Sequence, residues 1–188
     1  PGDVIIMAGG RVGKYGIHGA TFSSVEIDEH SPQSAVQIGS PITQKLLADF
    51  LVRACEAGLV KCSTDNGAGG LSSSIGELAT ISNGALINLE KVPLKYSGLK
   101  PWEIFVSESQ ERMTIVSDKK HVAELFDLAN QMEVELSDIG LFTNSGNLDV
   151  RFNNQPVALL DMHFLHEGVP LKILYAEYSK PNLQEPQL

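Results

Sequence analysis

The stretch KCSTDNGAGGLSSSIGE, residues 61–77, constrains the fold more than any other part of the sequence. One carboxylate, Asp65, stands directly before the nearly bare backbone of Gly67-Ala68-Gly69-Gly70, and serines follow. Glycine is needed where the chain takes left-handed conformations or where a ligand approaches the backbone closely. Leu59–Ser63 suits a strand and Leu71–Ile81 suits a helix, so the stretch predicts a strand, a loop and a helix in succession.

An acid at the end of a strand, where a loop begins, is a common ligand of Mg²⁺, a hard ion that keeps several waters and bridges to phosphate. The unshielded amides of the glycines and the positive end of the following helix both favour a phosphate group. Asp65 is therefore a candidate magnesium ligand. The alternative is a glycine-rich turn in which the Asp65 carboxylate only caps the backbone.

A second candidate cluster is the polar run SESQER, residues 107–112, which lies between the apolar runs Ile104–Val106 and Met113–Val116. Such flanks predict burial, and buried polar groups need hydrogen-bond partners. The alternative is a polar connecting loop.

The remaining pattern mixes strands and helices without strict alternation, which favours an α+β fold over a doubly wound one. Apolar residues recur every three or four positions from Pro41 to Ala57, and Pro41 suits a first helical position. The sequence also predicts a strand at Val4–Met7, a helix over 119–132, and a hairpin whose turn is Asn144–Asn147. Ser74 and Glu77 have the spacing of a capping box.

The bulk composition excludes several classes of function. The chain has 188 residues and a formal net charge of −9, and its lysines are scattered, so we expect no nucleic-acid surface. No apolar run approaches the roughly 20 residues of a membrane span, and no basic-then-apolar leader is present, so we expect a cytoplasmic protein. Cys55 and Cys62 are interpreted as core thiols of a reducing compartment.

Two other patterns resemble binding motifs without meeting their requirements. In GGRVGK, Ala8 stands where a phosphate loop needs glycine, and Tyr15 stands where it needs Ser or Thr. The histidines show no zinc spacing, although His163 and His166 are three apart and can share a helix face.

Four motifs occur together in the order and at the spacing of one family: GIHGATFSS at 16–24, SAVQIGSP at 34–41, DNGAGGLSSS at 65–74 and SESQERM at 107–113. Residues 1–176 resemble phosphoribosylformylglycinamidine synthase, the ATP-dependent amidotransferase of purine biosynthesis. The resemblance implies the first of two C-terminal-type domains of the aminoimidazole-ribonucleotide-synthetase fold, a mixed sheet with helices packed on one side. Residues 177–188 are expected to be a linker or a frayed end, and the missing initial methionine suggests an internal piece of a longer protein.

The same resemblance implies the roles of individual residues. Gln37 matches a residue that binds formylglycinamide ribonucleotide, and Glu108, Ser109 and Gln110 match a further substrate-binding triplet. Asp65 matches a magnesium ligand of the ATP site. Many members read QDMGAAGL where this chain reads TDNGAGGL, so it departs from that pattern beside Asp65 and keeps the acid.

The family's catalytic histidine, the lysine and glutamate around ATP, and the glutaminase cysteine have no matching motif here. We therefore expect this chain to contribute Mg²⁺ and substrate contacts, to need neighbouring synthetase domains and a glutaminase domain or subunit, and to be inactive alone. Self-association through an exposed Val4–Met7 side is also expected. The alternatives are a related enzyme of the aminoimidazole-ribonucleotide-synthetase or selenophosphate-synthetase type, and a non-catalytic interaction domain.

Overall fold

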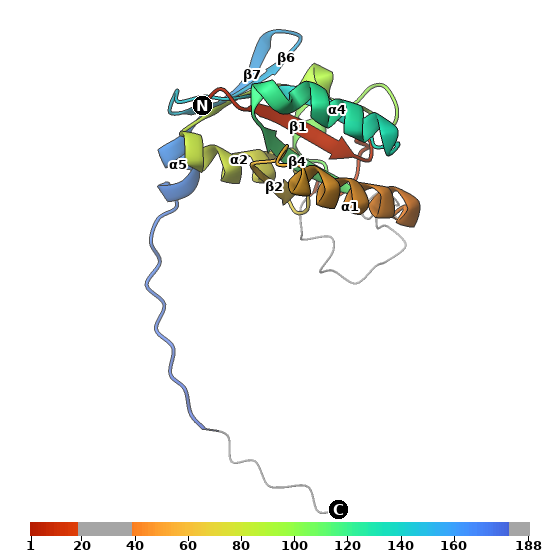
Figure 1. Cartoon of the computed structure of the whole chain (residues 1–188). Helices are drawn as coiled ribbons and strands as arrows, with labels where there is room; N and C mark the ends of the chain where they lie inside the picture. Colours follow the sequence, from red (N-terminus) through yellow and green to blue (C-terminus); the bar gives the residue numbers. More distant parts are fainter. Residues whose placement is uncertain (19–38, 181–188) are drawn as a thin grey trace, which may run out of the picture.

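The described part of the chain, residues 1–18 and 39–180 of the computed structural model, contains one mixed sheet of seven strands (Figure 1). The strand order is β2-β4-β1-β5-β3-β6-β7. All neighbouring strands are antiparallel except β3 and β6, which are parallel. The strands are β1 Val4–Gly9, β2 Cys62–Asp65, β3 Ala85–Asn88, β4 Arg112–Ser117, β5 Leu136–Phe142, β6 Asn147–Phe152 and β7 Gln155–Asp161.

The first strand, β1, lies between β4 and β5, and every one of its residues is buried. Because side chains alternate along a strand, Ile5 and Met7 face one side of the sheet while Val4 and Ile6 face the other. The predicted strand at this position is confirmed. The expectation that Val4–Met7 would present an exposed apolar side is wrong, since both of its faces are covered.

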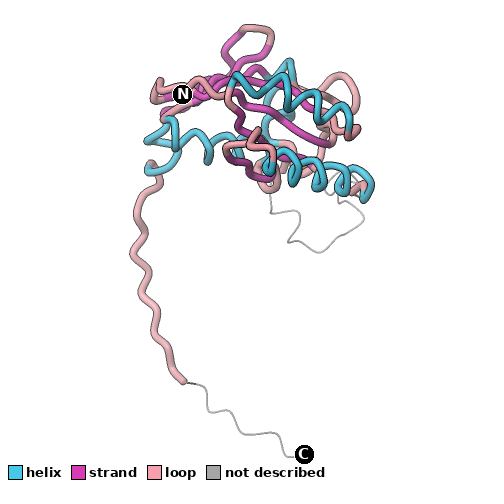
Figure 2. Tube along the Cα trace, viewed as in Figure 1, coloured by secondary structure: helices cyan, strands magenta, loops and turns pink. Residues whose placement is uncertain are grey.

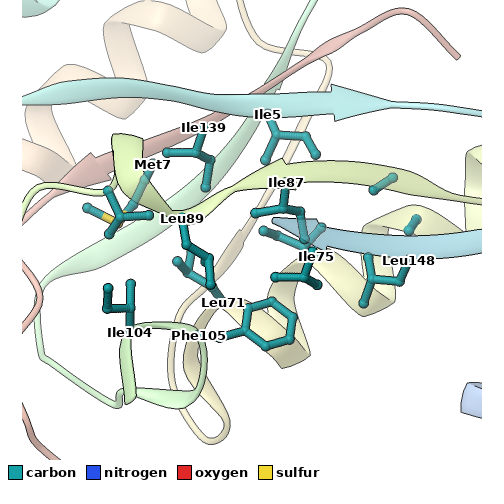
Figure 3. Close-up of a cluster of buried hydrophobic side chains, with 14 of the residues drawn as sticks. Ile5, Met7, Leu71, Ile75, Ile87, Leu89, Ile104, Phe105, Ile139 and Leu148 are labelled. Carbon is teal, nitrogen blue, oxygen red and sulfur yellow. The ribbon is translucent and has the colours of Figure 1, made fainter. Parts of the chain in front are cut away.

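Helices cover both faces of the sheet. The Ile5 and Met7 face packs against α2, α3 and α5, and Figure 3 shows the side chains of this cluster. The Val4 and Ile6 face packs against α1 and α4. The predicted α+β fold with a mixed sheet is confirmed, with the difference that the helices lie on two sides and not on one. The helices are α1 Pro41–Glu56, α2 Gly70–Ser82, α3 Pro101–Val106, α4 Val122–Gln131 and α5 Met162–Glu167, with short 3-10 turns at Leu89–Lys91 and Lys119–His121.

Helix α1 begins at Pro41, as predicted. Ser40 precedes it in an extended conformation and its side chain accepts a hydrogen bond from the amide of Thr43, 3.3 Å away. Proline lacks an amide hydrogen and so fits a first helical position, where that hydrogen would have no partner. Cys55, on α1, is exposed, so its interpretation as a core thiol is wrong. Cys62 is partly buried and packs against the core.

The predicted hairpin around Asn144–Asn147 is also wrong. Strands β5 and β6 do not pair, because β3 lies between them. The loop joining them hydrogen-bonds to the residues before β3 instead: the Thr143 amide reaches the carbonyl of Gly84 at 2.9 Å. The hairpin in this region is formed by β6 and β7, and its turn residues Asn153 and Asn154 have φ of 50° and 61°.

After α5 the chain continues as an extended segment without helix or strand, drawn as a long loop in Figure 2. Its side chains from Val169 to Lys180 are exposed, and the large apolar ones include Leu171, Ile173 and Tyr175. The proposed domain limit at residue 176 falls inside this segment and stays a prediction. No helix within the described ranges combines the length and the apolar character that crossing a membrane requires.

Candidate functional site

Asp65 is the last residue of β2, and its side chain is exposed. Its Oδ1 accepts a hydrogen bond from the amide of Gly67 at 2.9 Å, which is the local turn contact that short acidic side chains commonly make. No other described side chain or amide donates to this carboxylate in the structure. The turn alternative and the magnesium alternative are therefore compatible, because the turn contact uses Oδ1 and leaves Oδ2 without a hydrogen bond from the described residues.

Two glycines, Gly69 and Gly70, join this loop to the start of α2. Gly69 and Gly70 have φ of 77° and 56°, in the left-handed region that disfavours side chains. A Cβ on Gly70 would lie 2.1 Å from the carbonyl oxygen of Ser107, so only glycine allows this close approach. The predicted capping box is wrong, because α2 already begins at Gly70 and Ser74 lies inside it.

The carboxylate of Glu108 lies at the start of α2. Helix α2 has no side-chain cap from its own N-cap residue, Gly69, but Oε1 of Glu108 accepts the Gly69 amide hydrogen at 3.1 Å. A negative group at this end of a helix is favourable because the first amides are unpaired and carry partial positive charge. The loop after β2 and the polar run at 107–112 thus meet at one point.

Residues 107–111, here named the polar loop, are ordered by internal hydrogen bonds. Ser107 and Ser109 are almost fully buried, and their hydroxyl oxygens lie 2.9 Å apart. The Ser109 hydroxyl accepts the amide hydrogen of Gly13 at 2.9 Å, and the Ser107 hydroxyl donates to the Gly13 carbonyl at 2.7 Å. Gln110 is exposed, and its amide nitrogen lies 3.4 Å from the carbonyl oxygen of Glu108.

Arg112 supports the polar loop from the interior. It is 3% exposed, and its guanidinium donates to the carbonyl oxygens of Ser107 and Ser109, the latter at 2.8 Å. Within the described residues it forms no ion pair. Burial lowers the pKa of Arg112 to about 10, because a charged group loses hydration in the interior. The side chain therefore stays charged near neutral pH and fixes two carbonyls.

Two further polar residues belong to the site: Glu111, which lies in the predicted polar run, and Asn66, which was missed. Glu111, at φ 53°, accepts the Ser40 amide hydrogen at 2.8 Å and so connects the polar loop to the start of α1. Asn66 is 3% exposed; its Oδ1 accepts from the Thr114 hydroxyl at 2.7 Å, while its Nδ2 has no partner. A polar residue directly after Asp65, in a position where the resembling family has methionine, was the available signal for Asn66.

A cavity of about 320 Å³ brings the candidate residues together. Asp65, Ser109 and Gln110 all line it, together with apolar residues of α1. Glu108 is not in the lining, although it precedes the lining residue Ser109 in the polar loop. Gln37 lies outside the described residues. The full lining consists of Gln44, Leu47, Ala48, Leu51, Asp65, Asn66, Gly67, Ser109, Gln110, Glu111, Arg112 and Met113.

The oxygen ligands available for a cation are few. Within residues 1–18 and 39–180, no three His, Cys, Asp or Glu side chains gather closely enough to hold a metal ion. The hard, exposed oxygen of Asp65 fits Mg²⁺ as a single ligand, because that ion commonly takes only one or two carboxylates and completes its shell with water and phosphate. His166 is engaged elsewhere, with its Nε2 3.2 Å from the carbonyl oxygen of Gly76.

Comparison with known proteins agrees with this geometry. Residues 1–153 match the family model described as AIR synthase related protein, C-terminal domain. A curated relative, the phosphoribosylformylglycinamidine synthase subunit PurL of Methanopyrus kandleri, is 40% identical over 174 residues, which is 90% of this chain and 24% of the relative.

Solved structures show the same similarity. Thermotoga maritima PurL complexed with FGAR superposes with a TM-score of 0.86 and 32% identity over 98% of this chain and 31% of that one. The same T. maritima protein complexed with ATP gives 0.81 and 28%, over 100% and 30%. The chain thus spans about a quarter to a third of the relatives it matches, and the expected resemblance is confirmed. The chain belongs to the AIR synthase related protein family, as a C-terminal-type domain.

Proposed function

We propose that this chain is one domain of phosphoribosylformylglycinamidine synthase. The whole enzyme uses ATP and glutamine to convert formylglycinamide ribonucleotide to the corresponding amidine. The observation that carries the proposal is the superposition of 98% of the chain on a T. maritima PurL complexed with FGAR. It is supported by one cavity that Asp65 and the polar loop both line.

In this proposal the polar loop holds the ribonucleotide. The carboxylate of Glu108 can accept hydrogen bonds from the substrate. The side-chain amide of Gln110 can both donate and accept them. The hydroxyl of Ser109 is engaged with the Gly13 amide and the Ser107 hydroxyl, so the contribution of Ser109 is through the backbone of a loop held in one conformation. Gln37 completes the substrate contacts from the segment before α1.

Asp65 is proposed as a magnesium ligand of the ATP site. When bound, Mg²⁺ screens the charge of the phosphoryl group that ATP transfers to the formamide oxygen of the substrate. This chain would supply one ligand oxygen from the lining of the cavity, beside glycine backbone that allows a phosphate to come near. Ammonia from the glutaminase then displaces the phosphate, and that chemistry belongs to other parts of the protein.

The proposal is tested by kinetics of the full-length protein with two variants. Asp65→Asn keeps the shape of the side chain but removes its charge, so kcat should fall by roughly two orders of magnitude. The Mg²⁺ concentration needed for half-maximal activity should rise. Gln37→Ala should mainly raise KM for the ribonucleotide and leave the Mg²⁺ dependence unchanged.

Asp127→Asn, on the exposed side of α4, is the matched control and should behave as the unmodified protein. If Asp65→Asn has normal turnover at limiting Mg²⁺, the magnesium role is wrong and the stretch is only a turn. If the full-length protein does not form the amidine from the ribonucleotide, ATP and glutamine, the proposed reaction itself is wrong.

The isolated chain, residues 1–188, should show no ATPase or amidotransferase activity, because it supplies only part of the centre. We propose that it acts in the cytoplasm with neighbouring synthetase domains and a glutaminase domain or subunit. Measurable ATP turnover by the isolated chain that depends on the ribonucleotide would contradict this division of the active centre.

A further inference from the structure

Residues 10–16, here named the glycine segment, run beside the polar loop and are bonded to it at both ends. The amide of Gly10 donates to the carbonyl of Glu111 at 2.8 Å, and the amide of Glu108 donates to the carbonyl of Tyr15 at 2.8 Å. This segment lacks the residues that a phosphate loop requires. Its contacts are with the residues that are proposed to bind substrate.

The middle of the glycine segment is bonded as well. Gly13 uses both of its backbone groups: its amide donates to the Ser109 hydroxyl at 2.9 Å and its carbonyl accepts from the Ser107 hydroxyl at 2.7 Å. Both serines are buried, so these bonds have no competition from water. The conformation of the polar loop therefore depends on where the glycine segment lies.

Gly16 makes the closest approach. It has φ of 61°, and a Cβ built on it would lie 2.4 Å from Oε2 of Glu108 and 2.5 Å from the Cβ of the same residue. Rotating the carboxylate away would not relieve the second contact, because the Cβ of Glu108 moves only with its backbone. The bare backbone of Gly16 thus leaves the room in which Glu108 reaches the amide of Gly69.

The far side of the glycine segment is anchored to the body of the domain. The ammonium of Lys14 lies 2.8 Å from Oε1 of Glu103, a residue of α3 that is almost fully buried. The backbone amide of Lys14 donates to the hydroxyl of Tyr96 at 2.7 Å, and Val12 bonds to the carbonyl of Pro93 at 2.9 Å. The segment is therefore fixed between the domain body and the polar loop.

We propose that the glycine segment is the support that positions Glu108 toward the substrate, and that Gly16 is a positioning residue of the site. The inference rests on the proposed function, in which Glu108 contacts the ribonucleotide. Gly16 touches no reacting atom; it acts by leaving the space that one conformation of Glu108 needs.

The test compares steady-state kinetics of the full-length protein with Gly16→Ala, Gly58→Ala and Glu108→Gln. Gly58 also has a positive φ, 70°, but a Cβ there meets nothing within 4 Å. Gly58→Ala therefore introduces similar backbone strain to Gly16→Ala without a steric contact like that with Glu108. Gly16→Ala should raise KM for formylglycinamide ribonucleotide roughly tenfold with a small change in kcat, as expected for a misplaced binding group. Gly58→Ala should leave KM within about twofold of the unmodified protein.

Melting temperatures of Gly16→Ala and Gly58→Ala show whether a raised KM comes from a displaced Glu108 or from a general loss of stability. Similar melting temperatures with different KM values indicate displacement of Glu108. Equal KM values in Gly16→Ala and Gly58→Ala would overturn the inference, while Glu108→Gln with a raised KM would leave the proposed function intact. An unchanged KM in Glu108→Gln would overturn the role of Glu108 and the inference together.

If Gly16→Ala does not fold, Tyr96→Phe provides the test at a distance from the polar loop. This substitution removes the hydroxyl that accepts the Lys14 amide hydrogen, and it changes no group that contacts Glu108. KM for the ribonucleotide should rise about threefold, a small loss of positioning. An unchanged KM in this variant would count against the glycine segment as the support.

Discussion

Lys14 and Glu103 form an ion pair of 2.8 Å in which the carboxylate side chain is 6% exposed and the ammonium side chain is 49% exposed. The same carboxylate accepts the backbone amide hydrogen of Lys100 at 2.9 Å, at the start of α3. One nearly buried acid therefore holds both the first turn of a helix and the glycine segment that borders the candidate site.

This pair predicts a dependence of stability on pH. The hydrogen bond from Lys14, and next that from the Lys100 amide, lower the pKa of Glu103 below its ordinary value. A lowered folded-state pKa contributes stability that is present above the unfolded value and is lost as pH falls through the folded value. Urea unfolding between about pH 6 and pH 3 should show a shallower loss of stability in Glu103→Gln than in the unmodified protein. Glu124→Gln, on the exposed side of α4, is the control; an equal slope in both variants would contradict the prediction.

Arg112→Lys should destabilise the protein although it keeps the charge. The guanidinium reaches two carbonyl oxygens with separate nitrogens, and a single ammonium cannot reproduce that fork. A free-energy loss of roughly 2–4 kcal/mol is expected, because buried carbonyls lose their donors. Arg53→Lys, on the exposed surface of α1, should change the free energy of unfolding by less than about 0.5 kcal/mol. Denaturant titration measures both, and equal values would show that the fork is not needed.

Thr114→Val tests the buried polar chain beneath Asp65. The Thr114 hydroxyl lies 2.8 Å from that of Ser74 and 2.7 Å from Oδ1 of Asn66. Valine has nearly the same shape as threonine. The loss of unfolding free energy should therefore come from Oδ1 of Asn66, which is left without its donor, and amount to about 2 kcal/mol. Thr64→Val, at the paired position on β2, is the control and should be near neutral. Thermal or urea unfolding distinguishes the two, and a neutral Thr114→Val would show that water or rearrangement satisfies Asn66.

Asn154→Gly should stabilise the protein slightly. Asn153 and Asn154 occupy the turn between β6 and β7 with positive φ, and Asn-Gly is the pair most favoured where both central residues of a hairpin are left-handed. We expect a gain of roughly 0.5 kcal/mol for Asn154→Gly and a loss of about 1 kcal/mol for Asn154→Ala. Unfolding curves showing the same stability for both variants would mean that the turn does not depend on this conformation.

The elements that the sequence predicted well are those specified by local chemistry. Pro41 and the apolar spacing after it define α1, and the apolar run at Val4 defines β1. Strand neighbours were not predictable in the same way, because the turn residues at Asn144–Asn147 fit a hairpin equally well whether or not β3 enters between the two strands. Pairing is decided by the whole sheet.

The candidate site shows the same division. Asp65 and the polar run stood out by residue type, and the structure brings Asp65, Ser109 and Gln110 to one cavity. Gly16 and Arg112 lie within quoted motifs, but their supporting roles depend on a contact across more than ninety positions and on burial, which residue spacing does not show. The bond between Gly13 and Ser109 spans 96 positions and is equally invisible to spacing arguments.

The central place of β1 has a consequence for how the chain acquires its structure. Strand β1 can complete its pairing only when residues 112–117 and 136–142, which follow it in the sequence, have also been made. Until then neither of its buried faces, with Ile5 and Met7 on one and Val4 and Ile6 on the other, has a sheet to enter. Pairing between strands so far apart in the sequence is slow. A nascent or truncated chain that ends before β5 should therefore depend on chaperones, whatever the stability of the finished domain.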